Sequence, residues 1–168
     1  MKSTIRNIAL STNDDIRLCL NGKTVKVDYA TAGQVQDQVY YMTRNGKLTI
    51  SDCTAKTVDG VYTAGGFYNN TYTHTVAGGA LFARPNSTLN FYDGIVSGNL
   101  CATGGAAFYG KNATLNFYDG LVTGNKARNA AGVIIQGQSS FTMSGGTVTN
   151  NVAEKSGGGV YINNKSTF

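Results

Sequence analysis

The chain repeats one phrase at a fixed interval. Residues 113–125 read ATLNFYDGLVTGN, and residues 87–99, which lie 26 positions earlier, read STLNFYDGIVSGN with only three of the thirteen letters changed. Another 26 positions on, residues 139–151 read SSFTMSGGTVTNN, in which the letters differ but the order of apolar and polar positions is kept. A period between about 20 and 50 residues is typical of solenoids, propellers and other repeat arrays.

Within each repeat, apolar and polar residues alternate over short runs. In the second copy, Leu115 and Phe117 flank Asn116, and glycine, asparagine or Asp-Gly separates one run from the next. Alternation of this kind indicates β-strands, and no segment shows the spacing of a capped amphipathic helix. A propeller blade needs about 40 residues or more, so the period is too short for one. We therefore expect an all-β, right-handed parallel β-helix with three short strands in each coil of about 26 residues.

Equivalent residues of successive coils stack about 4.8 Å apart in such a solenoid. The repeat predicts four inward columns, which are Leu89/Leu115/Phe141, Phe91/Phe117/Met143, Val96/Val122/Val148 and Leu81/Ala107/Val133/Val160. Another set of equivalent residues, Asn99, Asn125 and Asn151, falls at a turn that follows a strand. Stacked side-chain amides can hydrogen-bond along a column, so we predict that these asparagines form an internal structural ladder rather than a surface row.

The length and the repeat predict a single β-helix domain over residues 1–168, with five to six coils. One coil is longer than the others, because Leu48 and Leu89 occupy the same position in their coils but lie 41 residues apart. We place the extra residues in a loop insertion at 61–75.

This insertion holds several aromatic residues and the only histidine of the chain, which are Tyr62, Phe67, Tyr68, Tyr72 and His74. Aromatic rings beside polar residues suit the binding of a sugar or of a protein surface. The same rings could instead fold onto the wall of the coil, and both roles stay open at this point. His74 has no second ligand or catalytic partner in the sequence, so we expect it to face solvent.

Charged residues are sparse and dispersed. Lys and Arg number 14, the net charge is +5, and no run of basic residues occurs. A nucleic-acid-binding strip should cluster its basic residues, so we expect no nucleic-acid partner. No apolar run is long enough to span a bilayer, and we expect no membrane insertion. The first residues, MKSTIRNIALSTNDD, lack the apolar core of a signal peptide.

The cysteines are Cys19, Cys53 and Cys101, at wide and irregular spacing. No Cys/His pattern typical of a metal site is present, and we expect neither a metal ion nor another cofactor. An odd number of cysteines argues against a disulfide framework, although it allows one bridge. We expect the cysteines to serve as small buried hydrophobic residues.

Three segments together resemble a known family. IRLCLNGKTV (16–25), GKLTISD (46–52) and FTMSGGTVTNNVAEKSGGGVYI (141–162) resemble the right-handed parallel β-helix segments of large bacterial surface proteins. Those segments of the bacterial surface proteins belong to the pectin-lyase-like superfold, and the repeats of this chain resemble the polymorphic-outer-membrane-protein type. The resemblance implies an extracellular or cell-surface location and a structural or adhesive role, with a glycan or a host surface protein as a partner. Because the chain shows no signal peptide, we expect it to be a mature or excised segment.

Some members of the superfold cleave acidic polysaccharides with a cluster of acidic residues on one parallel sheet. This chain has one row of carboxylates that resembles such a cluster. Asp52, Asp93 and Asp119 fall at the same position in their coils, and Arg84 or Lys111 could supply a basic partner. Such a row is the weak catalytic candidate for a polysaccharide lyase or hydrolase. The next copy has Gly145-Gly146 in this place, however, and all copies share only a turn. We therefore favour a turn role for these aspartates and expect no enzymatic activity.

An outward column and the last coil suggest interfaces. The residues of the column are Phe82, Phe108, Ile134 and Tyr161. If exposed, they would form an apolar stripe for a partner, and the alternative is that the insertion or another copy covers them. Phe168 falls where a further coil begins. We expect this end to stack on other copies of the chain or on flanking β-helix coils, so that a fibre could form.

Overall fold

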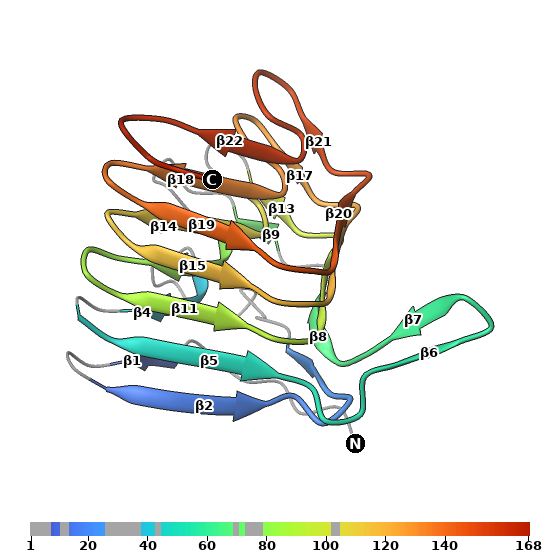
Figure 1. Cartoon of the computed structure of the whole chain (residues 1–168). Coiled ribbons are helices and arrows are strands. Elements are labelled where there is room, and N and C mark those ends of the chain that lie inside the picture. The colour runs from blue at the N-terminus through green and yellow to red at the C-terminus, as the bar shows by residue number, and fades with distance from the viewer. Residues whose placement is uncertain are drawn as a thin grey trace.

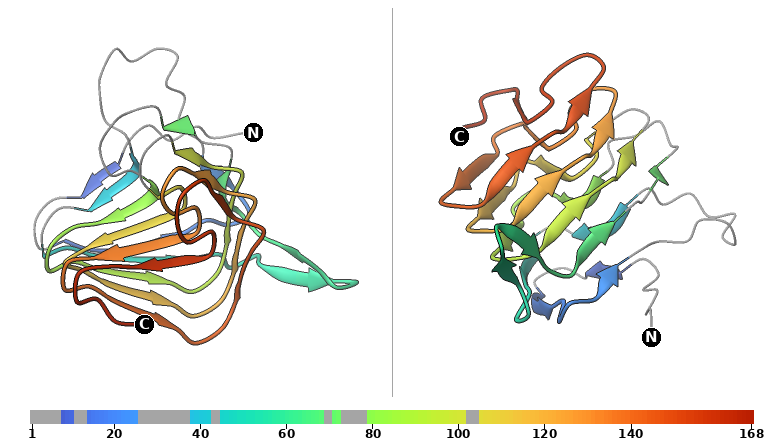
Figure 2. Two further views of the ribbon diagram at one scale, coloured as in Figure 1. Left: turned by 90° about the horizontal axis from the view of Figure 1, so that it is seen from above. Right: turned by 90° about the vertical axis from the view of Figure 1, so that its right-hand side faces the viewer.

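The computed structural model describes residues 8–10, 14–25, 38–42, 45–68, 71–72, 79–101 and 105–168. These residues form an all-β solenoid with no helix among them, a right-handed parallel β-helix as predicted (Figure 1). The strict spacing of 26 residues holds over the coils of the repeated phrase. Seen along its axis, the chain winds around one interior, with strands on successive faces (Figure 2).

Four parallel sheets line this interior, which we call sheets A to D in the order in which each coil passes through them. Sheet A contains β1 (Ile8–Leu10), β4 (Gln38–Met42), β10 (Gly79–Ala83), β14 (Phe108–Lys111), β18 (Val133–Gln136) and β22 (Val160–Ile162). Sheet B contains β2 (Asp15–Cys19), β5 (Lys47–Ser51), β11 (Thr88–Phe91), β15 (Thr114–Phe117) and β19 (Ser140–Met143). Sheet C contains β3 (Thr24–Val25), β8 (Gly66–Tyr68), β12 (Ile95–Ser97), β16 (Leu121–Thr123) and β20 (Thr147–Thr149). Sheet D adds short strands of two residues to the three expected per coil, namely β9 (Thr71–Tyr72), β13 (Leu100–Cys101), β17 (Lys126–Ala127) and β21 (Val152–Ala153).

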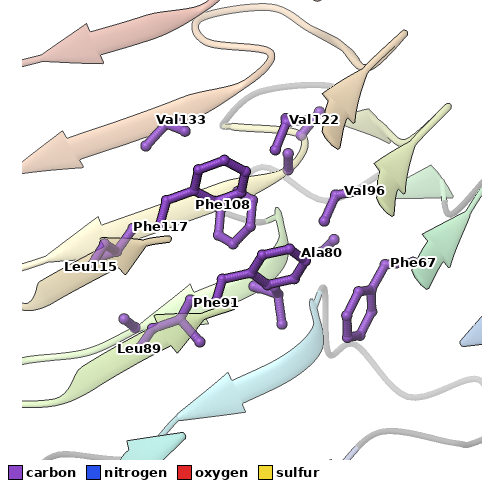
Figure 3. Close-up of a cluster of buried hydrophobic side chains, with 14 of the residues drawn as sticks. Phe67, Ala80, Leu89, Phe91, Val96, Phe108, Leu115, Phe117, Val122 and Val133 are labelled. Atoms are coloured by element: carbon purple, nitrogen blue, oxygen red, sulfur yellow. The ribbon is translucent and has the colours of Figure 1, made fainter. Parts of the chain in front are cut away.

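The core consists of files of side chains stacked from coil to coil. Leu89 pairs in register with Leu115, and Leu115 with Phe141, so the first predicted column is present. Phe91 and Phe117 stack with ring centroids 5.5 Å apart and an angle of 9° between the rings (Figure 3). Each buried leucine or phenylalanine contributes roughly 1.5–3 kcal/mol of transfer free energy. The repeat therefore reflects packing, since each coil meets only its neighbours.

The column in sheet A differs by one residue from the prediction. Leu81 pairs with Phe108 instead of Ala107, and Phe108 pairs with Val133. Phe108 follows Cys101 of β13 by seven positions, whereas Val133 follows the equivalent Ala127 by six, so the corner before β14 contains one residue more than the corner before β18. As a result Phe108 points into the core, where its ring meets Phe91 edge-on at 5.3 Å and Phe117 at 6.0 Å. The prediction that Phe108 belongs to an outward column is wrong for this reason.

The extra residues of the long coil form a hairpin. Strands β6 (Lys56–Val58) and β7 (Val61–Thr63) are antiparallel and project from the corner between sheets B and C (Figures 1 and 2). Asp59 and Gly60 at the tip have φ of 51° and 77°, which suits a two-residue hairpin turn. Most of the insertion thus precedes the predicted range 61–75, because the chain has already rejoined sheet C at β8.

Phe67 shows what this shift means for the predicted binding residues. It lies in β8, in register with Val96 and Val25, and its side chain is 0% exposed. Phe67 is therefore a core residue of the Val96/Val122/Val148 column (Figure 3), and its assignment as a ligand-binding residue is wrong.

The asparagines form a ladder inside the turn after sheet C. Asn99 donates from Nδ2 to Oδ1 of Asn125 at 2.9 Å, and Asn125 donates in the same way to Asn151 at 2.8 Å. The backbone N–H of Asn99 also donates to Oδ1 of Asn125, at 3.0 Å. Asn99 and Asn125 are fully buried. The ladder satisfies polar groups that burial would otherwise leave without partners.

Candidate functional site: the aspartate row and the outer face of sheet B

Asp52, Asp93 and Asp119 lie one above another at the corner between sheets B and C. Each comes two residues after a paired core position of sheet B, which is Ile50, Phe91 or Phe117. Neighbouring strands are about 4.8 Å apart, so the backbones of the three residues follow one another at about that interval along the axis. The structure brings the predicted row together, but it places the three side chains in different surroundings.

Asp52 is built into the base of the hairpin and is only 3% exposed. Its Oδ1 accepts hydrogen bonds from Thr54 N–H at 2.9 Å and Thr54 Oγ1 at 2.8 Å. Gly22 N–H donates to Oδ1 at 3.0 Å, and Gly65 N–H donates to Oδ2. Burial acts to raise the pKa of Asp52, but the bonds from Thr54, Gly65 and Gly22 outweigh it and hold the pKa below its usual value. Asp52 thus joins two coils and the hairpin, and its acceptor capacity is occupied.

Asp93 and Asp119 are more open. Burial raises the pKa of the half-buried Asp93, and the charges of Asp119 and Asp52 raise it further. Asp119 is exposed, and its Oδ1 accepts the N–H of Gly120 at 2.7 Å. Gly120 has φ of 114°, and a Cβ there would lie 2.6 Å from the carbonyl oxygen of Gly94. The Asp-Gly sequence therefore meets a backbone requirement of this corner, as the turn interpretation expects.

Arg84 and Lys111 lie at the other end of the strands of sheet B. Both belong to the corner between sheets A and B, where Arg84 follows β10 and Lys111 ends β14. Each four-residue strand that separates this corner from the aspartates is roughly 13 Å long. Neither residue stands beside the carboxylates, so the suggestion of Arg84 or Lys111 as the basic partner in catalysis is wrong.

The tyrosines of the predicted insertion attach the hairpin to the coil. The Tyr62 hydroxyl accepts the N–H of Gly94 at 3.2 Å, and the Tyr68 hydroxyl donates to the carbonyl of Ala64 at 2.9 Å. Both side chains are half-buried. Burial, followed by the charge of Asp52 and by Tyr62, raises the pKa of Tyr68 to about 12. The wall-packing role fits these two residues. His74 and the side chain of Tyr72 lie outside the described residues.

A disulfide between Cys19 and Cys53 joins the end of β2 to the start of the hairpin segment, with the Cα atoms 6.4 Å apart. Both residues are exposed, so the prediction of small buried hydrophobic residues is wrong for them. It holds for Cys101, which lies in the core. Sequence spacing could not pair these cysteines, because it does not show that β2 and β5 are neighbours.

The predicted outward column is buried rather than exposed. Phe82, Tyr109 and Ile134 are in register, with Tyr109 in the place predicted for Phe108, and Tyr161 follows at half burial. The ring centroids of Phe82 and Tyr109 are 4.6 Å apart. The column packs with Ala130 into a small separate cluster. Phe82, Tyr109 and Ile134 therefore do not form an exposed apolar stripe that a partner could bind.

One exposed aromatic pair was missed by the sequence reasoning. Tyr92 and Tyr118 stack with centroids 4.3 Å apart and an interplanar angle of 13°, and they are 42% and 37% exposed. The signal was in the repeated phrase, since a tyrosine follows the core phenylalanine in both copies. Alternation along the strand turns that tyrosine outward.

Comparisons with protein-family models, with curated proteins and with solved structures give no match to this chain. In the described part of the chain, no cluster of three or more His, Cys, Asp or Glu residues could hold a metal ion. The same part contains no helix long and apolar enough to cross a membrane.

Proposed function

We propose that this chain is a non-enzymatic structural or adhesive β-helix module of a bacterial cell-surface or extracellular protein. The resemblance of its repeats to those of large surface proteins supports this role. The Cys19–Cys53 disulfide suits an oxidising compartment outside the cytosol. Asp52 supports a structural use of the aspartate row, since its oxygens already accept bonds from three segments of backbone.

The proposal depends on the last member of the Leu89/Leu115/Phe141 column, which is Phe168 at the C-terminal end of the solenoid. Phe168 stacks on Phe141 with ring centroids 5.1 Å apart, yet it is 67% exposed. The Thr167 carbonyl accepts the Phe141 N–H at 2.9 Å, which starts a further rung. A ring in this position continues the Leu89/Leu115/Phe141 column and offers its outer face to the next coil. In the proposed assembly, a coil of another copy of the chain packs against this ring.

Sedimentation velocity over a range of concentrations tests the stacking. The wild-type chain should associate as its concentration rises, and Phe168→Asp should reduce this association, because a charge would then face the incoming apolar coil. Val61→Asp, which places the same charge on the projecting hairpin, is the matched control and should associate like the wild type. A wild-type chain that stays monomeric at every concentration would remove self-stacking from the proposal.

A second candidate function, a polysaccharide-cleaving enzyme, has one observation in its favour. Asp93 and Asp119 are successive carboxylates, and the pKa of Asp93 is raised while Asp119 lies open to solvent. Incubation with neutral and acidic polysaccharides, followed by assay of reducing ends or unsaturated products, decides between the two functions. We expect no cleavage. Cleavage that is lost in Asp93→Asn and Asp119→Asn, with the fold intact, would establish the enzyme instead.

A further inference from the structure

The outer face of sheet B consists of three ordered columns of side chains. Its strands β5, β11, β15 and β19 run side by side across the front of the molecule in Figure 1. One column carries hydroxyls, one, which we call the amide column, carries two amides between two threonines, and one contains the stacked tyrosines; their members are Thr88/Thr114/Ser140, Thr49/Asn90/Asn116/Thr142 and Ser51/Tyr92/Tyr118/Ser144. We call these three columns together the sheet B face.

Hydrogen bonds within the columns hold the polar groups in place. Asn116 donates from Nδ2 to Oδ1 of Asn90 at 2.8 Å, and Asn90 donates to Oγ1 of Thr49 at 3.3 Å. Ser140 and Thr114 hydroxyls meet at 3.4 Å. The side chains are thus ordered before any ligand arrives, which lowers the entropic cost of binding. Asn90 is only 7% exposed, Asn116 is half-buried and Thr142 is exposed, so Asn116 and Thr142 present the accessible polar groups of the amide column and Asn90 supports Asn116 from below.

The tyrosine pair offers flat apolar area at its two ends. On the coil after Tyr118 the equivalent residue is Ser144, and on the coil before Tyr92 it is Ser51. A serine is too small to cover a phenol ring, and the two tyrosines, which stack on each other, are 42% and 37% exposed. An open aromatic face beside hydroxyl and amide groups is the arrangement that recognises a sugar ring, which has apolar C–H faces and a polar rim.

The charges around this face favour a neutral ligand. Over β11, β15 and β19, the described columns contain only Thr, Ser, Asn and Tyr. On β5 and β2 the columns continue with Lys47, which forms an ion pair with Asp15 at 3.2 Å, and with Arg17, so the basic residues of this face lie at the end of the sheet that precedes β11. Asp93 and Asp119 border the tyrosines and would repel a polyanion. An acidic polysaccharide would instead need arginine or lysine beside the tyrosines, and the tyrosine column contains neither over β5, β11, β15 and the residue after β19.

We propose that the sheet B face binds an uncharged oligosaccharide or polysaccharide, with sugar rings on Tyr92 and Tyr118 and hydroxyl groups on the amide and hydroxyl columns. This inference rests on the adhesive role proposed above and names the ligand class for it. The ligand runs over side chains that repeat from coil to coil, so a glycan with several sugar units engages more of them than a single sugar does.

Isothermal titration calorimetry with cellohexaose, xylohexaose and mannohexaose as neutral probes, and with a polygalacturonate hexamer as the acidic probe, tests the proposal. The wild-type chain should bind at least one neutral probe more tightly than the acidic one. Tyr118→Ala and Tyr92→Ala should each weaken this binding at least about tenfold, because each removes a ring face. Tyr118→Phe keeps the ring and should bind nearly as well as the wild type. Leu100→Ala, an exposed site on sheet D, is the control and should not change the affinity.

Failure of the sheet B face would be distinct from failure of the proposed function. The inference is overturned if no neutral probe binds, if only the acidic probe binds, or if both tyrosine variants bind like the wild type. None of these results alters the concentration dependence of sedimentation, which reports the stacking of coils. Cleavage of a bound neutral probe would overturn the non-enzymatic role, and its loss in Tyr118→Ala would still support the sheet B face.

Discussion

Asn99 and Asn125 share a hydrogen bond of 2.9 Å between their side-chain amides inside the solenoid, where neither residue is accessible to solvent. The same amide of Asn125 continues to Asn151 and also donates to the carbonyl of Val96. A single side chain therefore connects three coils. Its removal would leave buried donors and a buried acceptor without partners.

Asn125→Ala should consequently lower the free energy of unfolding by about 2–5 kcal/mol, since each unsatisfied buried group costs roughly 1–3 kcal/mol. Urea denaturation measures the change. Asn116→Ala removes an amide from the outer face, where water can replace the lost bonds, and should cost less than about 1.5 kcal/mol. Equal losses in the two variants would show that the inner ladder has no special importance.

Asp52 should make stability depend on pH. Its pKa in the folded chain is lower than in the unfolded chain, so its stabilising contribution is fully present above the unfolded pKa of about 3.9. The contribution is lost as the pH falls through the folded pKa. At pH 7, Asp52→Asn should be less stable than the wild type by about 1.5–3 kcal/mol, because charge-assisted hydrogen bonds are replaced.

Denaturation of both chains between pH 7 and pH 2 tests this dependence. The difference in unfolding free energy should shrink below about pH 4. Asp119→Asn serves as the control, since Asp119 is exposed and the substitution should change stability little at any pH. A difference between wild type and Asp52→Asn that stays constant across this range would contradict the role given to the Asp52 carboxylate.

Phe67→Ala should destabilise the fold by about 3–5 kcal/mol, the usual cost of removing a fully buried phenylalanine. Thermal or chemical denaturation gives the value. Val61→Ala, on the exposed hairpin, should stay within about 0.5 kcal/mol of the wild type. If Phe67→Ala were as stable as Val61→Ala, Phe67 would not belong to the core, and the predicted surface role for this residue would return.

The sequence predicts the stacked strand residues well and the corners of the coils poorly. The strands repeat because their side chains stack, so Leu89, Leu115 and Phe141 could be placed together from spacing alone. The lengths of the corners are less constrained by stacking. The corner before Phe108 contains one residue more than the corner before Val133, and no residue in the sequence indicates that difference. The face to which a residue belongs therefore follows from the strand register, and corner lengths set that register.

The aspartate row shows a related limit. The sequence placed Asp52, Asp93 and Asp119 at one position, which is where they lie. It could not reveal that Asp52 alone is enclosed, because its hydrogen-bond donors Gly22 and Gly65 come from segments 30 and 13 residues away. Neither donor follows any repeat that could have drawn attention to it.

The Cys19–Cys53 disulfide should stabilise the first coils and the base of the hairpin. Reduction by dithiothreitol should lower the free energy of unfolding by about 2–4 kcal/mol, as expected when a bridge of this loop length is removed. The double variant Cys19→Ser/Cys53→Ser should already have the lower stability, and the reductant should not change it further. A wild-type chain that is equally stable with and without reductant would contradict a structural role for the bridge.

The central claim is that the C-terminal end of the solenoid receives another coil. Hydrogen–deuterium exchange of the backbone amides in β19, β20 and β22, followed from dilute to concentrated solution, tests it most directly. Coil-on-coil stacking predicts that exchange of these amides slows as concentration rises, that amides in β11 and β15 stay unchanged, and that Phe168→Asp abolishes the effect. Exchange at β19, β20 and β22 that does not depend on concentration would contradict the claim.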